Sequence, residues 1–274
     1  TRERDVHIFI SLNARLPALL EESYQWLVSV VAQHQGGVVI LGGHRADDGQ
    51  LLDYQDVQVV MEDGKPTSKE HFGYTDGIGD PVFEGTPNYD LNVHGRGKQM
   101  ADGSWAPLAT GEFLLGHIDE AHEYPPAPQP VLLSRNGTYM VYRKLHENVA
   151  TFDAYLDEHG KKYPGGKELL AAKFVGRWRD NGAPLVKAPD AESKAKFDMA
   201  LLGADQRGKD KLLSDFTYDE DMSGGKCPFS AHIRRINPRA SLEMVKGENP
   251  GSMILNKEAF DTPGALTNRR RLLR

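Results

Sequence analysis

Residues 73–81 read Gly-Tyr-Thr-Asp-Gly-Ile-Gly-Asp-Pro, with Asp76 near the centre and a glycine on either side of it. Glycine adopts positive φ angles without steric cost, so such a segment turns tightly and approaches a flat ligand closely. A turn of this kind would hold the Asp76 carboxylate over the ligand. Aspartate and glycine also dominate ordinary surface turns, in which the aspartate caps its own backbone. The stretch therefore indicates a turn and leaves two roles open for Asp76.

This turn lies inside a long segment, 61–130, that is rich in Gly, Pro, Asp and Asn. We predict that most of the segment is loop, with one short ordered part at 112–115. A loop of this length in a compact chain is usually functional.

The regions on either side of the loop show the periodicities of strands and helices. Alternating or continuous apolar residues predict strands at 6–10, 38–41, 54–61 and 137–145. Helical patterns begin at Pro17 and recur at 148–156 and 168–175, and the charged stretch 192–221 predicts a solvated helix and loop. The Gly-rich turn of a dinucleotide-binding fold is missing. The pattern favours an α+β fold, with antiparallel sheets that carry helices on one side.

Composition limits the classes of function. The 274-residue chain has a formal net charge of -6, so its field does not favour nucleic acid, although its last residues are basic. Cys227 is the single cysteine, which excludes an intrachain disulfide and a cluster of thiolate ligands. No apolar run is long enough to span a bilayer. We expect neither nucleic acid nor membrane as a partner; the compartment stays open, with a cytoplasmic location as the working expectation.

A second candidate site lies at residues 227–239, which read CPFSAHIRRINPR. His232 stands between small and apolar residues, and three arginines follow it. An imidazole in this setting suits an iron ligand, and guanidinium groups suit an anionic cofactor edge such as the propionates of haem. A structural histidine in a basic turn is the alternative for this segment taken alone.

Together the two segments resemble the dye-decolourising (DyP-type) peroxidase family in order, spacing and detail. GYTDG at 73–77 is similar to the family's GxxDG motif, and the region 231–239 resembles its proximal-histidine region. GEFLLG at 111–116 and SRNGTY at 134–139 also resemble family segments. The similarity runs from about Val6 to the end of the chain.

The resemblance implies two ferredoxin-like halves of the dimeric α+β barrel type. Residues 1–112 would form the first half, with a haem-covering loop over 61–112, and residues 113–274 would form the second, haem-binding half. Haem b would lie between the loop and the second half. The implied activity is peroxide-dependent one-electron oxidation of organic donors, so hydrogen peroxide and donors such as dyes and phenols are the implied partners.

The resemblance also assigns residues to the cofactor. His232 would be the axial ligand of the haem iron. Arg239 would pair with a propionate, and Arg234 and Arg235 are further candidates for that pairing. The loop residues that would contact the cofactor are Gly77, Ile78 and Gly79.

Two residues would carry the implied chemistry. Asp76 would accept the proton from one oxygen of hydrogen peroxide and return it to the other, so that the second oxygen leaves as water. Arg274 would be the distal arginine, which stabilises the developing negative charge without competing for the proton. Because chains of the family begin before the position of Val6 and continue past that of Arg274, we expect a fragment or a nicked or trimmed chain. A further expected partner is a complementary polypeptide segment that completes the haem pocket. Formation of a homo-oligomer stays an open alternative.

Two other functions stay open. A non-catalytic protein that binds or transfers haem would need His232 but would be indifferent to Asp76. A metal-dependent hydrolase would use the ligand-rich segment 117–123, which reads HIDEAHE and lacks HExxH spacing.

Overall fold

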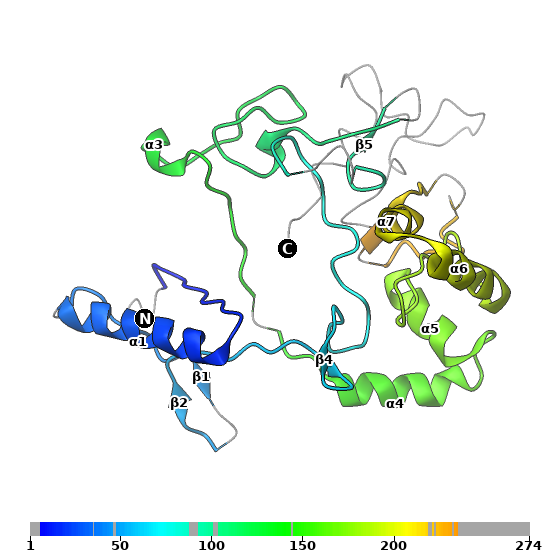
Figure 1. Cartoon of the computed structure of the whole chain (residues 1–274), viewed down its shortest axis with the longest axis horizontal. Helices are drawn as coiled ribbons and strands as arrows, with labels where there is room; N and C mark the ends of the chain where they lie inside the picture. Colours follow the sequence, from blue (N-terminus) through cyan, green and yellow to red (C-terminus); the bar gives the residue numbers. More distant parts are fainter. Residues whose placement is uncertain are drawn as a thin grey trace. The chain divides into compact units, whose positions relative to one another are not determined.

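The structure is a computed structural model that describes residues 6–34, 36–45, 48–87, 93–100, 104–143, 145–218, 221, 223–231 and 233–234. The chain divides into two compact units, Thr1–Gln58 and Val59–Arg274 (Figure 1). The long loop 61–112 lies wholly in the second unit. The predicted division into halves at residues 112 and 113 stays a prediction.

The first unit contains a single long helix and a short hairpin within its described part. The helix is α1 (Pro17–Gln33), and the hairpin pairs β1 (His44–Arg45) with β2 (Leu51–Leu52) antiparallel. Pro17 occupies the first turn, where its fixed φ suits the helix and its missing N–H costs nothing. The predicted helix start is therefore confirmed. None of the described side chains of α1 is buried.

Three predicted strands are not formed as expected; of the one at 54–61, only Met61 is assigned to a strand. Residues 6–10 and 38–41 are not assigned to any strand in the described part of the chain. Their apolar side chains are exposed, with Ile8 at 68% and Val39 at 67%. The apolar pattern has no sheet to occupy there, because a strand forms only against a paired neighbour.

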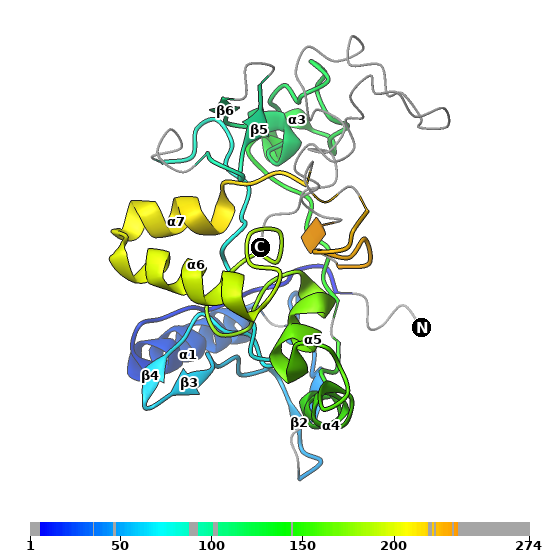
Figure 2. The same cartoon turned by 90° about the vertical axis from the view of Figure 1, so that its right-hand side faces the viewer.

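The second unit is largely helical. Its longer helices are α4 (Val149–Gly160), α5 (Gly166–Val175), α6 (Ala191–Gly203) and α7 (Gln206–Ser214). α4 packs against α5, and α6 packs against α7 (Figure 2). Asn148, Asp190 and Asp205 cap α4, α6 and α7 by accepting backbone N–H groups of the first turn. The helices predicted at 148–156 and 168–175 are confirmed.

The rest of the second unit is mostly loop with short hairpins. The strands are β3 (Met61–Glu62), β4 (Lys65–Pro66), β5 (Lys98–Gln99) and β6 (Trp105–Ala106), in antiparallel pairs, and the short helices are η2 (Thr110–Glu112) and α3 (Val131–Ser134). This confirms the predicted loop at 61–130. The predicted strand at 137–145 is not formed in the described residues, and Val141 is 80% exposed.

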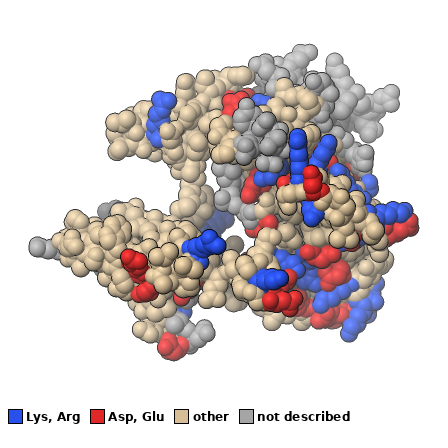
Figure 3. All heavy atoms as spheres, in the orientation of Figure 1, with Lys and Arg blue, Asp and Glu red and all other residues tan. Residues whose placement is uncertain are grey.

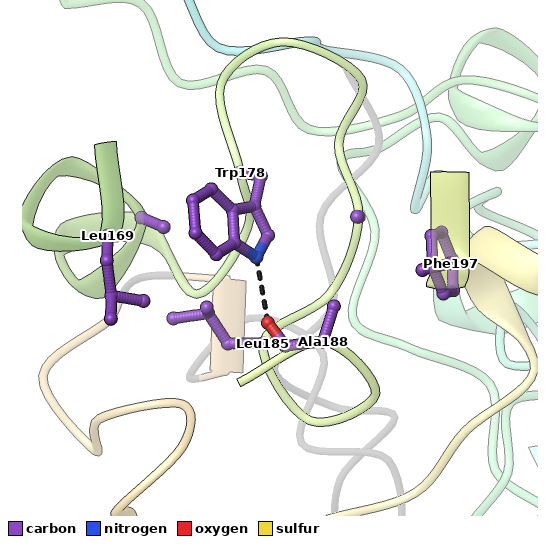
Figure 4. Packing of buried hydrophobic residues seen from close by; sticks show 7 residues of the cluster. Leu169, Trp178, Leu185, Ala188 and Phe197 are labelled. Carbon is purple, nitrogen blue, oxygen red and sulfur yellow. Dashed lines mark hydrogen bonds between the residues drawn. The ribbon is translucent and has the colours of Figure 1, made fainter. Parts of the chain in front are cut away.

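The core of the second unit is formed by residues of α5, of the turn after it and of α6 (Figure 4). Its cluster contains Leu169, Ala172, Trp178, Ala183, Leu185, Ala188 and Phe197. The Trp178 indole N–H donates to the Ala188 carbonyl at 2.8 Å, which satisfies its polar atom inside the core. A second cluster contains Val186, Phe216, Tyr218, Cys227 and Ala231. This second cluster ends one residue before His232.

Charges of both signs are interspersed over the helices of the second unit (Figure 3). The stretch 192–221, expected to be solvated, is only partly so, because Lys194 and Phe197 of α6 are buried. Lys194 donates to Asp180 at 2.8 Å and to Asp198 at 2.6 Å, which compensates its burial. Among the described helices, none combines the length and apolar character that crossing a membrane requires.

Candidate active site

Asp76 lies in a tight turn next to an antiparallel bridge between Lys69 and Thr75. Its N–H donates to the Ser68 carbonyl at 2.8 Å, and its Oδ1 accepts the Gly77 N–H at 2.9 Å. Gly77 has a φ of 82°, which favours glycine. The Asp76 residue is exposed. The turn therefore includes the capping bond of an ordinary surface turn and still presents the carboxylate to the surroundings.

Hydrogen bonds to α5 and to the turn after it hold this loop in place. The buried Tyr74 hydroxyl donates to the Ala171 carbonyl at 2.7 Å. Burial raises the pKa of Tyr74, so the hydroxyl keeps the proton that it donates. The Thr75 hydroxyl donates to the Arg179 carbonyl at 3.4 Å, and the Arg179 guanidinium donates to the Phe72 carbonyl at 3.2 Å. The backbone on either side of Tyr74 is thus fixed from both directions.

The next residues of the loop contact the turn at Gly182 and the end of α7. The Ser214 hydroxyl donates to the Ile78 carbonyl at 3.1 Å. A Cβ atom on Gly182 would lie 2.1 Å from the Cδ1 atom of Ile78, so a larger residue there would displace the end of the Ile78 side chain. A Cβ atom on Gly79 would meet nothing within 4 Å. Of the predicted cofactor contacts, Ile78 packs its side chain against Gly182, whereas Gly79 borders open space.

The second candidate segment is organised by a buried ion pair. Arg234 Nη1 lies 2.8 Å from Asp221 Oδ2, and the two side chains are 3% and 2% exposed. Arg234 also donates to the carbonyls of Asp221 at 2.7 Å and Cys227 at 2.6 Å. Its guanidinium carbon lies 4.4 Å from the Tyr218 ring centroid and 4.5 Å from that of Phe229. The structure thus gives Arg234 a protein carboxylate as its partner, where the sequence suggested a propionate.

Several predicted residues lie outside the described part of the chain, namely His232, Arg235, Arg239 and Arg274. The residues on both sides of His232 are described. The Ala231 N–H donates to the Pro228 carbonyl at 3.0 Å, and the Arg234 N–H donates to the Ala231 carbonyl at 3.1 Å. Ala231 is fully buried. The described residues Ala231 and Arg234, on either side of position 232, are therefore held by backbone hydrogen bonds.

Arg177 joins the surroundings of the two segments. Its buried guanidinium donates to the Gly182 carbonyl at 2.8 Å and to the Leu213 carbonyl at 2.9 Å. Burial lowers the pKa of Arg177, although the guanidinium stays protonated at any physiological pH. The same group lies 5.6 Å from the ring centroid of Phe216, which packs in the cluster that contains Cys227. The turn that touches Ile78 and the cluster that ends at Ala231 therefore belong to one packed body.

Asp221 and Arg177 also belong to this region, although neither was predicted from the sequence. Asp221 stands in a stretch dense in charge, and Arg177 precedes a tryptophan and a second arginine. Charged residues of this kind are mostly exposed, so no local signal marks these two as buried. A signal would have to link Asp221 with Arg234, which is a non-local pairing.

The ligand-rich segment 117–123 does not gather its side chains on a common centre. His117 Nε2 lies 2.7 Å from Asn136 Oδ1, whereas Glu120 accepts from Lys98 at 2.9 Å. Asp119 Oδ1 accepts the Ala121 N–H of its own turn at 2.8 Å. Over the described ranges, no group of three or more histidine, cysteine or acidic side chains could hold a metal ion.

Comparison with known proteins gives relatives of one kind. No family model matches the chain. A dye-decolorizing peroxidase of Mycena epipterygia is 31% identical over 214 residues, which is 72% of this chain and 35% of the relative. The multifunctional dye peroxidase of an Amycolatopsis species is 36% identical over 179 residues, which is 63% of this chain and 32% of the relative. The chain spans between 31% and 51% of the length of the curated relatives that it matches.

The solved fungal DyP-type peroxidase of Auricularia auricula-judae has a similar fold, with a TM-score of 0.50 at 24% identity. The match covers 83% of this chain and 43% of that one. This likeness confirms the predicted α+β class, of the ferredoxin-like kind expected for the family. In sequence, then, the chain is similar to dye-decolorizing peroxidases, and its fold is similar to that of a solved DyP-type peroxidase.

Proposed function

We propose that this chain carries the haem-binding part of a peroxidase that reduces hydrogen peroxide and oxidises organic donors, such as dyes and phenols, by one-electron steps. The observation that supports it best is that the Asp76 turn and the segment around position 232 are parts of one packed body, joined through Arg177 and Gly182. Each segment alone has an ordinary structural explanation, whereas a shared body fits a shared site. The names of the relatives point to the same chemistry.

The proposed cofactor is haem b, and the described residues fit a planar group beside the Asp76 turn in one respect. Gly79 borders open space and the Asp76 residue is exposed, so the loop has room for a flat ligand at its surface. His232 would hold the iron, and Arg239 would pair with a propionate. When bound, haem supplies the iron at which peroxide is reduced and through which donors are oxidised.

Asp76 is the proposed acid–base residue. Its carboxylate would accept the proton from one oxygen of hydrogen peroxide and return it to the other, so that water leaves. The bond from the Gly77 N–H to Oδ1 fixes the orientation of the carboxylate before peroxide arrives. Arg274 is the proposed partner that stabilises negative charge as the peroxide bond breaks.

Replacement of two residues tests the proposal. In the haem-loaded protein, Asp76→Asn should keep the haem absorption band and slow the reaction with peroxide by about 10²- to 10⁴-fold, the usual contribution of a general acid–base residue. His232→Ala should lose the band. Asp63→Asn is the matched control, because Asp63 is exposed in the β3–β4 turn and its φ of 51° is one that asparagine also adopts. This control should change neither the band nor the peroxide rate.

The same variants separate the proposal from its alternatives. Unchanged peroxide reactivity in Asp76→Asn, together with loss of haem in His232→Ala, would indicate a protein that binds or transfers haem without turnover. The metal-dependent hydrolase is not favoured, since the relatives are peroxidases and the 117–123 side chains have separate partners. A band that survives in His232→Ala would remove His232 as the axial ligand.

We further propose that a complementary polypeptide segment completes the haem pocket. Residues 138–143 are extended without a strand assignment, and Met140 and Val141 are 64% and 80% exposed. The neighbouring helix α3 exposes Leu132 and Leu133 at 85% and 81%. An extended apolar segment of this kind is a template for strand addition. A homo-oligomer is the other arrangement that would cover these residues.

A further inference from the structure

We propose that Asp221 and Arg234 are positioning residues, which fix the described backbone on both sides of His232 and thereby support the proposed axial ligand. The inference rests on the proposed function, because it takes His232 as the iron ligand. Both side chains are described by the structure. Asp221 lies eleven positions before His232 in the sequence, and Arg234 lies two positions after it.

Hydrogen bonds hold the described backbone near position 232. Hydrogen bonds from the Ala231 N–H to Pro228 and from the Arg234 N–H to Ala231 make two successive turns. The first turn ends at Ala231, directly before position 232, and the second bond joins Ala231 to Arg234, two positions after it. A displacement of Arg234 would therefore disturb the bonds that hold the residues flanking position 232.

Three acceptor oxygens and two aromatic rings constrain the Arg234 guanidinium. It donates to a carboxylate oxygen and to two backbone carbonyls, those of Asp221 and Cys227, at 2.6 to 2.8 Å. Tyr218 and Phe229 lie within 4.5 Å of the guanidinium carbon. The planar fork fixes its direction through the acceptors and its tilt through the rings. The guanidinium is therefore held in one orientation, which also restrains the Arg234 backbone bonded to Ala231.

Asp221, the acidic member of the pair, also binds the backbone. Asp221 accepts the N–H groups of Lys226 at 2.9 Å and Cys227 at 2.8 Å, in addition to Arg234. One carboxylate thus ties the start of segment 226–234 to its end. A lysine at 234 would supply charge without the fork, and an asparagine at 221 would supply one acceptor oxygen in place of two, without the charge. Neither replacement would reproduce the clamp.

A second, largely buried ion pair of the same unit allows a positioning role to be distinguished from a contribution to stability. A buried ion pair is weak evidence for stability, since apolar residues of similar volume often stabilise a protein as well. The pair between Lys98 and Glu120 is a comparison within the same unit, with a side-chain exposure of 14% and 2% and an N–O distance of 2.9 Å. Both carboxylates also accept backbone N–H groups. The two pairs differ in that only the first lies beside position 232 in the sequence.

The test compares Asp221→Asn with Glu120→Gln in the haem-loaded protein. We expect Asp221→Asn to weaken haem binding about 10- to 100-fold, the usual effect of losing a group that orients a metal ligand, and to shift the iron–histidine stretching band. Glu120→Gln should leave the band in place. Amide hydrogen exchange of the chain without haem provides a second measurement, in which the Ala231 and Arg234 amides should exchange faster in Asp221→Asn alone.

The outcomes distinguish the two proposals. A parent protein whose band does not depend on His232 overturns the proposed function, and with it the role in axial ligation. A parent with a histidine-dependent band that Asp221→Asn leaves unchanged overturns only the positioning role. If Asp221→Asn does not fold, Arg234→Lys takes its place, since it keeps the buried charge; an unshifted band in that variant contradicts the inference equally.

Discussion

At the scale of the residue, Cys227 shows how burial determines the state of a side chain. Its thiol is 1% exposed, and burial raises its pKa above the ordinary value. The unfolded chain loses the thiol proton at about pH 8.5, whereas the folded chain keeps it to higher pH. Unfolding above that pH therefore releases a proton, so rising pH favours the unfolded state. This part of the stability is complete below about pH 8.5 and is lost as the pH passes the folded pKa.

Cys227→Ala should remove this pH dependence. We expect the free energy of unfolding of the parent to fall more steeply above about pH 8.5 than that of Cys227→Ala. Urea denaturation at several pH values from neutral to strongly alkaline measures both slopes. Parallel curves for the two proteins would show that the thiol ionises with equal ease in the folded and unfolded chains.

At the scale of the element, the Asp76 loop depends on a glycine outside it. Gly182 has a φ of 74°, and a Cβ atom there would lie 2.1 Å from Ile78 Cδ1. Gly64 in the β3–β4 turn has a φ of 73° and nothing within 4 Å of such an atom. Alanine at either position has the same backbone strain, about 1–2 kcal/mol. The difference between the two substitutions therefore isolates the contact with Ile78.

We expect Gly182→Ala to destabilise the chain by about 0.5–1.5 kcal/mol more than Gly64→Ala, which is the usual cost of moving a side chain such as that of Ile78 off its rotamer. Urea unfolding of the two variants at neutral pH measures the difference. In the haem-loaded protein Gly182→Ala should also slow the reaction with peroxide, because the displaced Ile78 is two residues from Asp76. Equal stabilities would mean that the loop moves aside freely, and the anchoring described for it would be wrong.

At the scale of the whole molecule, much apolar surface is exposed in the described residues of both units. Trp26 of α1 is 65% exposed in the first unit, and Leu132 and Val141 exceed 75% in the second. Apolar surface gathered into a large exposed patch marks an interaction site. We expect the part of the Mycena epipterygia relative that lies outside the match to bind this chain when the two are co-expressed.

Val141→Lys should weaken that association about 10-fold or more, since a charge buried at a strand interface costs at least 1.4 kcal/mol. The stability of the isolated chain should not change, because the Val141 side chain is already 80% exposed. Glu158→Lys, on the exposed surface of α4, is the control and should bind as the parent does. Co-purification followed by titration measures both. Equal binding of the two variants would exclude residues 138–143 from the interface.

Local chemistry explains which features the sequence could predict. The start of α1 at Pro17 and the glycines of the Asp76 turn follow from the φ preferences of single residues. The prediction of a strand at 137–145 was wrong for the described residues, because strand formation depends on a neighbour distant in sequence, which a local pattern does not reveal. The pair between Asp221 and Arg234 likewise joins residues whose local setting is that of an ordinary charged surface.

The bonds that hold the Asp76 turn also set the order in which it can form during synthesis. Tyr74 bonds to a residue 97 positions later, and Ile78 to one 136 positions later. At about 5–20 residues per second, the ribosome adds those 136 residues in roughly 7–27 seconds. The turn must therefore emerge without its anchors and wait for α5 and α7. The peroxide-binding face proposed for this chain would thus be assembled late by the nascent protein, after its helices.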